Sequence, residues 1–261
     1  MVKLAAKQRN NNMKLALVDN KKVEAAKGLK GTCQLCQEPV IPKCGKIRVY
    51  HWAHKSCTHC DRWWENETEW HRNWKNQFPE EWQEVVAFDE KTSEKHIADI
   101  KTNYGMVIEF QHSYISEEER ISRELFYKNM IWVVDGTRRK RDYERFCDIL
   151  GNLWYLPNTS LYVVKYGIDN IPKEWQNCKV PVFFDFQGLL GHCNYDQRKN
   201  HLWCLLPIRE QNRGLFVIIA FNRETFAKDI INGKYTFNYR EIANMIDNNI
   251  RKFQNVSIRR L

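Results

Sequence analysis

Long apolar runs are missing from this chain of 261 residues, and proline and glycine are scarce. No run approaches the about 18 apolar residues that a membrane-spanning helix needs, and the first residues lack the apolar core of a secretion signal. We therefore expect a cytoplasmic protein without a membrane partner. With only 7 Pro and 11 Gly against 43% hydrophobic residues, the composition predicts a folded chain and excludes a disordered one.

Acidic residues are in the minority. The chain has 32 Asp and Glu against 41 Lys and Arg, which gives a formal net charge of +9. An excess of positive charge favours a polyanionic partner such as DNA. The nine cysteines include two C-x-x-C pairs, and without a secretion signal metal binding is a better explanation for them than disulfides.

Residues 96–111 have the pattern of a β-hairpin that carries acidic groups. Asn103-Tyr104-Gly105 suits a three-residue loop with a left-handed glycine at its end. In that register Asp99 lies opposite Glu109, and Gln111 shares the face of Glu109. Two opposed carboxylates indicate a divalent cation between them, Mg²⁺ or Mn²⁺, since such ions prefer carboxylate oxygens. The alternative is a solvated polar face on an edge hairpin.

A third carboxylate lies upstream in a Trp-rich segment. The spacing of five residues predicts one face of a helix ending near Phe78-Pro79: Trp63, Glu67, Trp70, Trp74 and Phe78. An ionised Glu67 is costly within this apolar stripe unless it is paired or bound to metal. His71 and Lys75 flank the same face. The alternative is that Glu67 extends its carboxylate to solvent or simply pairs with Lys75.

Residues 33–60 have the spacing of a zinc knuckle. Cys33 and Cys36 form the first half of a tetrahedral set of nitrogen and sulfur ligands. Two completions have workable spacing, one with His51 and His54 and the other with Cys57 and Cys60.

Four segments together resemble a known family. Glu67-Thr68-Glu69-Trp70-His71 resembles the E-S/T-x-x-H helix of competence protein CoiA-like nucleases. Ala98-Asp99-Ile100 and Ile108-Glu109-Phe110-Gln111-His112-Ser113 are similar to the A-D-V and E-F-Q-x-S strands of that family, and His51-Trp52-Ala53-His54 is similar to its H-F-A-H. The resemblance covers about residues 30–135.

The resemblance implies an α/β fold with a PD-(D/E)XK restriction-endonuclease-like core, in which a central mixed sheet is flanked by helices. It also implies that Gln111 replaces the usual lysine. We expect a zinc-binding module at 1–61, the nuclease core at 62–150 and an α/β extension at 151–261. The family pattern favours a mixed zinc set, which consists of Cys33, Cys36, His54 and Cys60, although His51 or Cys57 could take part instead.

The implied activity is metal-dependent hydrolysis of DNA. Asp99 and Glu109 would bind Mg²⁺ or Mn²⁺ directly, and Glu67 would bind a second metal or a metal-bound water. Gln111 could orient the attacking water, while His71, Lys75 or Lys101 would supply the missing positive charge. The rival hypothesis is a zinc-containing nucleic-acid-binding protein that no longer cuts DNA. A protein-interaction adaptor is a third.

Two basic features downstream are candidates for DNA contact. Ser116 and Glu119 form a capping box, after which Arg123 either pairs locally with Glu119 or braces the site and meets a phosphate. A basic run follows the strand predicted at 131–134 and could bind a phosphate backbone: Arg138, Arg139, Lys140 and Arg141.

The C-terminal half has strand-like runs at 161–165, 180–186, 202–206 and 215–221. We expect a helix after them with Asn222 as its N-cap, a Phe221/Phe226 staple and Gly233 at its end, and then an amphipathic helix over 242–253. The pattern indicates an extension of the core sheet. Its role is open, and a homo-oligomer or a protein partner bound through this half is compatible with it.

Overall fold

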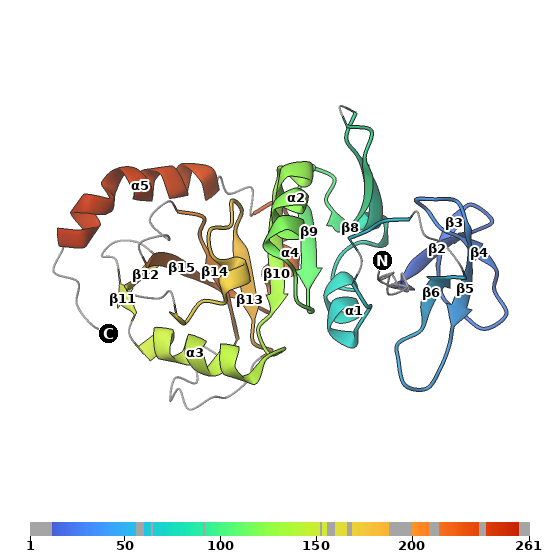
Figure 1. Cartoon of the computed structure of the whole chain (residues 1–261), viewed down its shortest axis with the longest axis horizontal. Helices are drawn as coiled ribbons and strands as arrows, with labels where there is room; N and C mark the ends of the chain where they lie inside the picture. The colour runs from blue at the N-terminus through green and yellow to red at the C-terminus, as the bar shows by residue number, and fades with distance from the viewer. Residues whose placement is uncertain are drawn as a thin grey trace, which may run out of the picture. The chain divides into compact units, whose positions relative to one another are not determined.

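The computed structural model describes residues 12–55, 60–63, 65–90, 92–151, 153–155, 160–165, 169–187, 200–208, 214–234 and 239–255. Contacts between residues divide the chain into two compact units, Met1–Lys101 and Thr102–Leu261, whose elements are drawn in Figure 1. The domain boundaries expected near residues 61 and 150 lie inside these units. In the described ranges, no helix has the length and apolar character to cross a membrane.

The first unit contains a six-stranded antiparallel sheet with strand order β1-β6-β5-β4-β2-β3. Its strands are β1 (Asn12–Met13), β2 (Leu15–Val18), β3 (Lys21–Glu24), β4 (Gly31–Thr32), β5 (Pro39–Lys43) and β6 (His51–His54). Trp52 is fully buried among small and branched side chains such as Ala16 and Val40. Gly31 is needed beside it, because a Cβ there would lie 3.2 Å from the Trp52 ring.

The same unit continues with helix α1 (Glu69–Lys75), a short helix η1 (Glu80–Trp82) and an antiparallel pair, β7 (Gln83–Phe88) and β8 (Lys95–Lys101). The helix is shorter than the Trp spacing predicted. It begins only after Thr68, whose hydroxyl accepts a hydrogen bond from the backbone N–H of His71, and it ends at Asn76. The prediction that Trp63 and Glu67 lie on this helix is therefore wrong. An N-cap residue lies just before the first helical residue, so the helix begins at Glu69 and both residues precede it.

The second unit contains seven strands of a mixed sheet, in the order β11-β12-β15-β14-β13-β10-β9. The strands are β9 (Val107–Gln111), β10 (Met130–Asp135), β11 (Trp154–Tyr155), β12 (Leu161–Lys165), β13 (Val182–Asp185), β14 (His201–Leu205) and β15 (Leu215–Asn222). Strands β9, β10 and β13 are parallel, and the others are antiparallel. This confirms the α/β class and the extension of the sheet by the C-terminal half.

The remaining elements of this unit are α2 (Glu117–Tyr127), α3 (Lys140–Gly151), η3 (Lys173–Trp175), α4 (Phe226–Ile231) and α5 (Tyr239–Asn255). The expected cap of α4 is wrong. Asn222 accepts hydrogen bonds from the N–H groups of Glu224 and Thr225 in a turn before the helix, and Thr225 is the N-cap. The Phe221/Phe226 ring contact and the left-handed Gly233 are confirmed.

The turn at the start of the second unit has the predicted form. Thr102 donates its N–H to the Met106 carbonyl at 2.9 Å, so residues 103–105 form the loop. Gly105 has a φ of +85°, which a residue with a Cβ adopts only with strain. The opposition of Asp99 and Glu109 remains a prediction.

Candidate metal centre and acidic cluster

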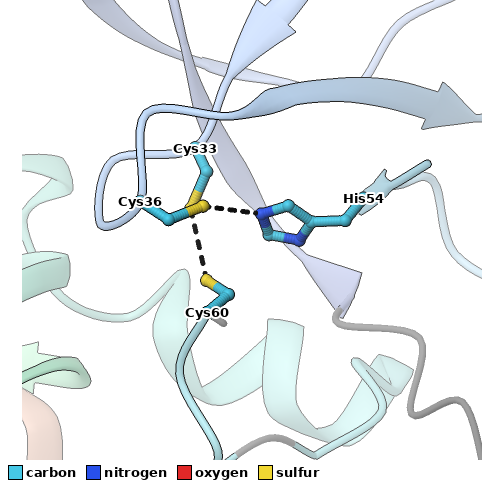
Figure 2. Close-up of side chains that lie close together, drawn as sticks. All are labelled: Cys33, Cys36, His54 and Cys60. Atoms are coloured by element: carbon cyan, nitrogen blue, oxygen red, sulfur yellow. Dashed lines mark hydrogen bonds between the residues drawn. The ribbon is translucent and has the colours of Figure 1, made fainter. Parts of the chain in front are cut away.

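Three cysteines and one histidine converge at the base of the β5–β6 hairpin (Figure 2). Cys33 and Cys36 lie in the turn between β4 and β5, which is closed by the Gln37 N–H donating to the Cys33 carbonyl at 3.1 Å. His54 is the last residue of β6, and Cys60 lies further along the chain, before α1. The predicted set of four ligand residues is thus brought together.

The distances in this group suit a tetrahedral zinc ion. The Sγ atoms of Cys33 and Cys60 are 3.7 Å apart, and Cys36 Sγ lies 3.2 Å from His54 Nε2. Zinc–sulfur bonds of about 2.3 Å and zinc–nitrogen bonds of about 2.0 Å place such atoms about 3.6–3.8 Å apart. All four ligand atoms lie within 4.8 Å of one another, so a small adjustment would close them around one ion.

The sulfur atoms lie close enough to shift one another's pKa values. A hydrogen bond from Cys60 lowers the pKa of the Cys33 thiol to about 4, whereas donating that bond raises the pKa of Cys60. A hydrogen bond to the ionised form of a group favours that form, so the two thiols shift in opposite directions. A bound zinc ion would let all three ionise. His54 presents Nε2 to this group, and its buried Nδ1 has no hydrogen-bond partner among the described residues.

The alternative ligands behave differently. His51 is buried, and its Nδ1 lies 2.8 Å from the Val49 carbonyl, outside the group of four. Cys57 lies outside the described residues. In the part of the chain that the structure describes, Cys33, Cys36, His54 and Cys60 are the only group of three or more His, Cys, Asp or Glu whose ligand atoms lie close enough together to hold one metal ion.

A buried lysine stands at the centre of an acidic cluster in the first unit. Lys75, the last residue of α1, places its Nζ 2.9 Å from Glu67, 3.0 Å from Glu84 and 3.0 Å from Asp99. The three carboxylates come from the segment before α1, from β7 and from β8. The pairing of Glu67 with Lys75 is the alternative that the sequence left open, and it is confirmed.

Lys75 stays charged despite its burial. Burial alone lowers the pKa of this ammonium, but Asp99, Glu67 and Glu84 together raise it well above its ordinary value. The side chains of Lys75 and Glu67 are each 3% exposed and that of Glu84 is 4% exposed, whereas Asp99 is 22% exposed. Asp99 is therefore the carboxylate of the cluster that solvent reaches.

Glu84 is a member of the cluster that the sequence analysis missed. Its carboxylate also accepts the backbone N–H groups of Lys14 and Leu15, at 2.9 and 2.8 Å, and so holds the start of β2. The residue has a φ of +45°, which is unusual for a residue with a side chain. Its one signal in the sequence was the position of an acidic residue at the start of a predicted strand, where an unpaired charge is costly.

His71 lies apart from the Lys75 ammonium and has its own partners. Its Nε2 is 3.6 Å from a Glu65 carboxylate oxygen, and its Nδ1 is 2.8 Å from the Thr68 hydroxyl. Burial lowers the pKa of His71, but Glu65, Asp99 and Glu67 together raise it and the net shift is upward. His71 thus adds positive charge beside the cluster as the pH falls.

In the second unit, Glu109 is held by a buried arginine. Arg123 donates to Glu109 at 2.9 Å and to Glu119 at 2.5 Å. Burial lowers the pKa of Arg123, but the two carboxylates raise it, so the guanidinium is a fixed positive charge. This geometry fits the interpretation of Arg123 as a brace.

Gln111 lies two residues beyond Glu109 on β9. Its Nε2 donates to the Ser113 carbonyl at 3.1 Å. The Oε1 atom is buried and finds no hydrogen-bond partner among the residues that the structure describes. A buried acceptor of this kind suits a water molecule or a ligand that donates a hydrogen bond.

The basic run at 138–141 is partly neutralised. Arg138 lies 3.1 Å from Glu174, and Arg139 pairs with both Glu174 and Asp142. Lys140 and Arg141 open α3 and are exposed. The structure thus leaves less free charge here than the sequence suggests.

A polar network at the carboxyl ends of β10 and β13 was also missed. Asp135 lies 2.7 Å from His112 Nδ1, and Asp185, its neighbour in register, is bound by Arg223 at 2.7 Å. Burial raises the pKa of Asp135, but hydrogen bonds from His112 and Thr137 lower it overall. These residues are far apart in sequence, so no local motif indicates them.

Comparison with known families gives one match. Residues 15–62 match the family model described as Competence protein CoiA, N-terminal domain. The matched segment contains the whole Cys3His group and ends before Glu67. It supports the resemblance to CoiA for this part of the chain. The comparisons with curated proteins and with solved structures found no match.

Proposed function

We propose that this protein is a metal-dependent nuclease that hydrolyses phosphodiester bonds in DNA, with a CoiA-like, competence-related role in DNA processing. The observation that carries the proposal is the buried Lys75 with its three carboxylates. Burying four ionised groups is costly, and such clusters with strongly shifted pKa values are concentrated at functional sites.

Each residue has a stated role in the proposal. In the first unit, Asp99 would hold Mg²⁺ or Mn²⁺, since carboxylate oxygens suit hard cations, and Glu67 would bind a second metal or a metal-bound water. The metal, when bound, supplies an activated water and shields the phosphate. Lys75 would supply a fixed positive charge in the first unit. In the second unit, Glu109 would offer a carboxylate to a metal ion, and the buried Gln111 Oε1 would accept a hydrogen bond from a water.

A second function is favoured by a specific observation. The Lys75 ammonium pairs with Glu67, Glu84 and Asp99 directly, and a nuclease-like core that has lost activity would retain this pairing as a structural feature. The protein would then bind nucleic acid without cutting it, with zinc as a structural ion in the Cys3His group.

Cleavage assays with two matched variants decide between these functions. Wild-type protein, Asp99→Asn and Asp169→Asn are incubated with single- and double-stranded DNA, with Mg²⁺, with Mn²⁺ or without added divalent metal. Asp169 is an exposed acidic residue of the second unit and serves as the control. We expect metal-dependent cutting by the wild type and the control, and loss of cutting in Asp99→Asn with DNA binding retained. Equal cutting by all three proteins, or none by the wild type, contradicts the proposed activity.

A further inference from the structure

We propose that the β5–β6 hairpin of the first unit, residues 39–55, contacts the phosphate backbone of a nucleic acid. The inference rests on the proposed function only for its choice of DNA as the partner. The evidence for the surface itself is the charge, the exposure and the anchoring of the hairpin.

The hairpin carries uncompensated positive charge. The chain has no Asp or Glu between Glu38 and Asp61. Four basic residues of the hairpin are exposed, namely Lys43, Lys46, Arg48 and Lys55. None of them forms an ion pair with another described residue. Phosphates are therefore the natural counter-charge for this surface.

Three of the basic residues predicted from the sequence, Arg123, Arg138 and Arg139, are already paired with carboxylates, whereas Lys140 and Arg141 are exposed. Arg123 is buried between two carboxylates, and Arg138 and Arg139 share Glu174. An arginine bound to a carboxylate must give up that pair before it can bind a phosphate. The hairpin needs no such exchange, so it is the better site for initial contact.

The loop is held at its base. Strands β5 and β6 are paired up to Lys43 and His51, where the loop begins and ends. His51 Nδ1 also lies 2.8 Å from the Val49 carbonyl oxygen. On the same side, Arg72 of α1 donates to the Tyr50 carbonyl at 2.5 Å. The Cys3His group lies at the base of the hairpin, because His54, one of its four residues, is the last residue of β6. Figure 1 shows the loop between β5 and β6 extending away from the strands.

The end of this loop has an apolar side chain between two cations. Ile47 is 98% exposed and is flanked by Lys46 and Arg48, and Tyr50 is 42% exposed. Beside a polynucleotide, such residues pack on sugars and bases while their neighbours bind phosphates. An anionic membrane could also attract the charges, but membrane-surface binding uses a broad apolar face, and the loop offers one fully exposed aliphatic residue.

Arg72 links the hairpin to the acidic cluster. Besides Tyr50, it lies 3.7 Å from Glu67, and it is one helical turn from Lys75. A strand bound along the hairpin would therefore lie beside the helix that carries Lys75. This arrangement would deliver the phosphate backbone to the proposed site.

Salt-dependent binding tests the inference with two charge-matched variants. The hairpin variant carries Lys43→Gln, Lys46→Gln and Arg48→Gln. The control variant carries Lys173→Gln, Lys179→Gln and Lys228→Gln, which are exposed residues of the second unit. Affinity for single- and double-stranded DNA is measured by fluorescence anisotropy across a salt series, with zinc retained and no Mg²⁺ or Mn²⁺ added.

Three lost phosphate contacts should reduce the slope of log affinity against log salt by about 2.7 for duplex DNA and by about 2.1 for single strands. Over a roughly fourfold rise in salt, the hairpin variant should lose about 40-fold less duplex affinity than the wild type. The control variant should keep the wild-type slope. Ile47→Ser should weaken binding without changing the slope, because it removes an uncharged contact.

Equal slopes for the hairpin variant, the control and the wild type overturn the inference. A second result also overturns the inference. If the hairpin variant binds DNA like the wild type but no longer binds vesicles of phosphatidylserine and phosphatidylcholine, the hairpin is a membrane-binding surface. Asp99→Asn separates this outcome from the proposed activity. It should bind DNA with the wild-type salt slope and fail to cut, whereas the hairpin variant should regain cutting at low salt.

Discussion

Replacing Lys75 by methionine should destabilise the first unit strongly and in a pH-dependent way. Methionine keeps most of the length of the side chain and removes the ammonium that lies within 3.0 Å of Glu67, Glu84 and Asp99. The perturbation therefore leaves three carboxylates around an uncharged group, and two of them are almost completely buried.

The expected magnitude follows from the burial of the pair. Removing one partner of a buried ion pair costs about 3–5 kcal/mol, because the other charge stays desolvated without compensation. The wild-type lysine has a pKa raised well above its ordinary value, so its contribution is complete at neutral pH and is lost only as the pH rises through that raised value. In the variant the penalty comes from uncompensated negative charge, so it should shrink as the pH falls.

Urea unfolding followed by tryptophan fluorescence can measure this effect, since the buried Trp74 precedes Lys75 on α1. The free energy of unfolding should drop by about 3–5 kcal/mol at pH 7.5 and by clearly less at pH 5. Lys21→Met is the matched control, because this exposed lysine of β3 has no ion pair with a described residue. The same variants are measured with zinc present.

Two results would refute the reasoning. A loss below about 1 kcal/mol at pH 7.5 would mean that the carboxylates are solvated like surface groups, for which single ion pairs contribute little. A large loss that is identical at both pH values would mean that methionine disturbs packing and that the charge is irrelevant.

Two further predictions concern metal and charge. The purified protein should contain about one zinc ion per chain, and Cys33→Ser should release it and unfold the β4–β6 region; elemental analysis that finds no zinc would contradict this. Replacing Arg138, Arg139 and Arg141 by alanine should flatten the salt dependence of DNA binding less than the hairpin variant does, because Glu174 already neutralises part of that run. A larger effect than that of the hairpin variant would show that this run binds the backbone after all.

Local chemistry was enough for several parts of the fold. The left-handed Gly105 set the loop of residues 103–105, and Ser116 capped α2 as its spacing with Glu119 predicted. The strands of the C-terminal half also appear where apolar runs indicated them. Each of these features depends on residues within a few positions of one another, so a linear pattern contains the required information.

The resemblance favoured Cys33, Cys36, His54 and Cys60 as zinc ligands, but spacing alone left His51 open, and the tertiary structure places it outside the group. His51 and His54 are three residues apart on β6, and side chains on a strand alternate between its two faces. They therefore point to opposite sides, and only His54 reaches Cys36. The spacing in the sequence suits both histidines, but it does not show that they lie on one strand with their side chains on opposite faces.

The sequence by itself determined the α/β class, the Cys-x-x-Cys half of the metal centre and two acidic residues of the Lys75 cluster, Glu67 and Asp99. Only the tertiary structure decided that Lys75 would join Glu67 to Glu84 and Asp99, and that Glu174 would take the charge of Arg138 and Arg139. Charges interact through space, and a buried charge must find a partner wherever the fold places one. Which cations remain free for a polyanion is therefore settled by distant carboxylates, and these leave the β5–β6 hairpin uncompensated.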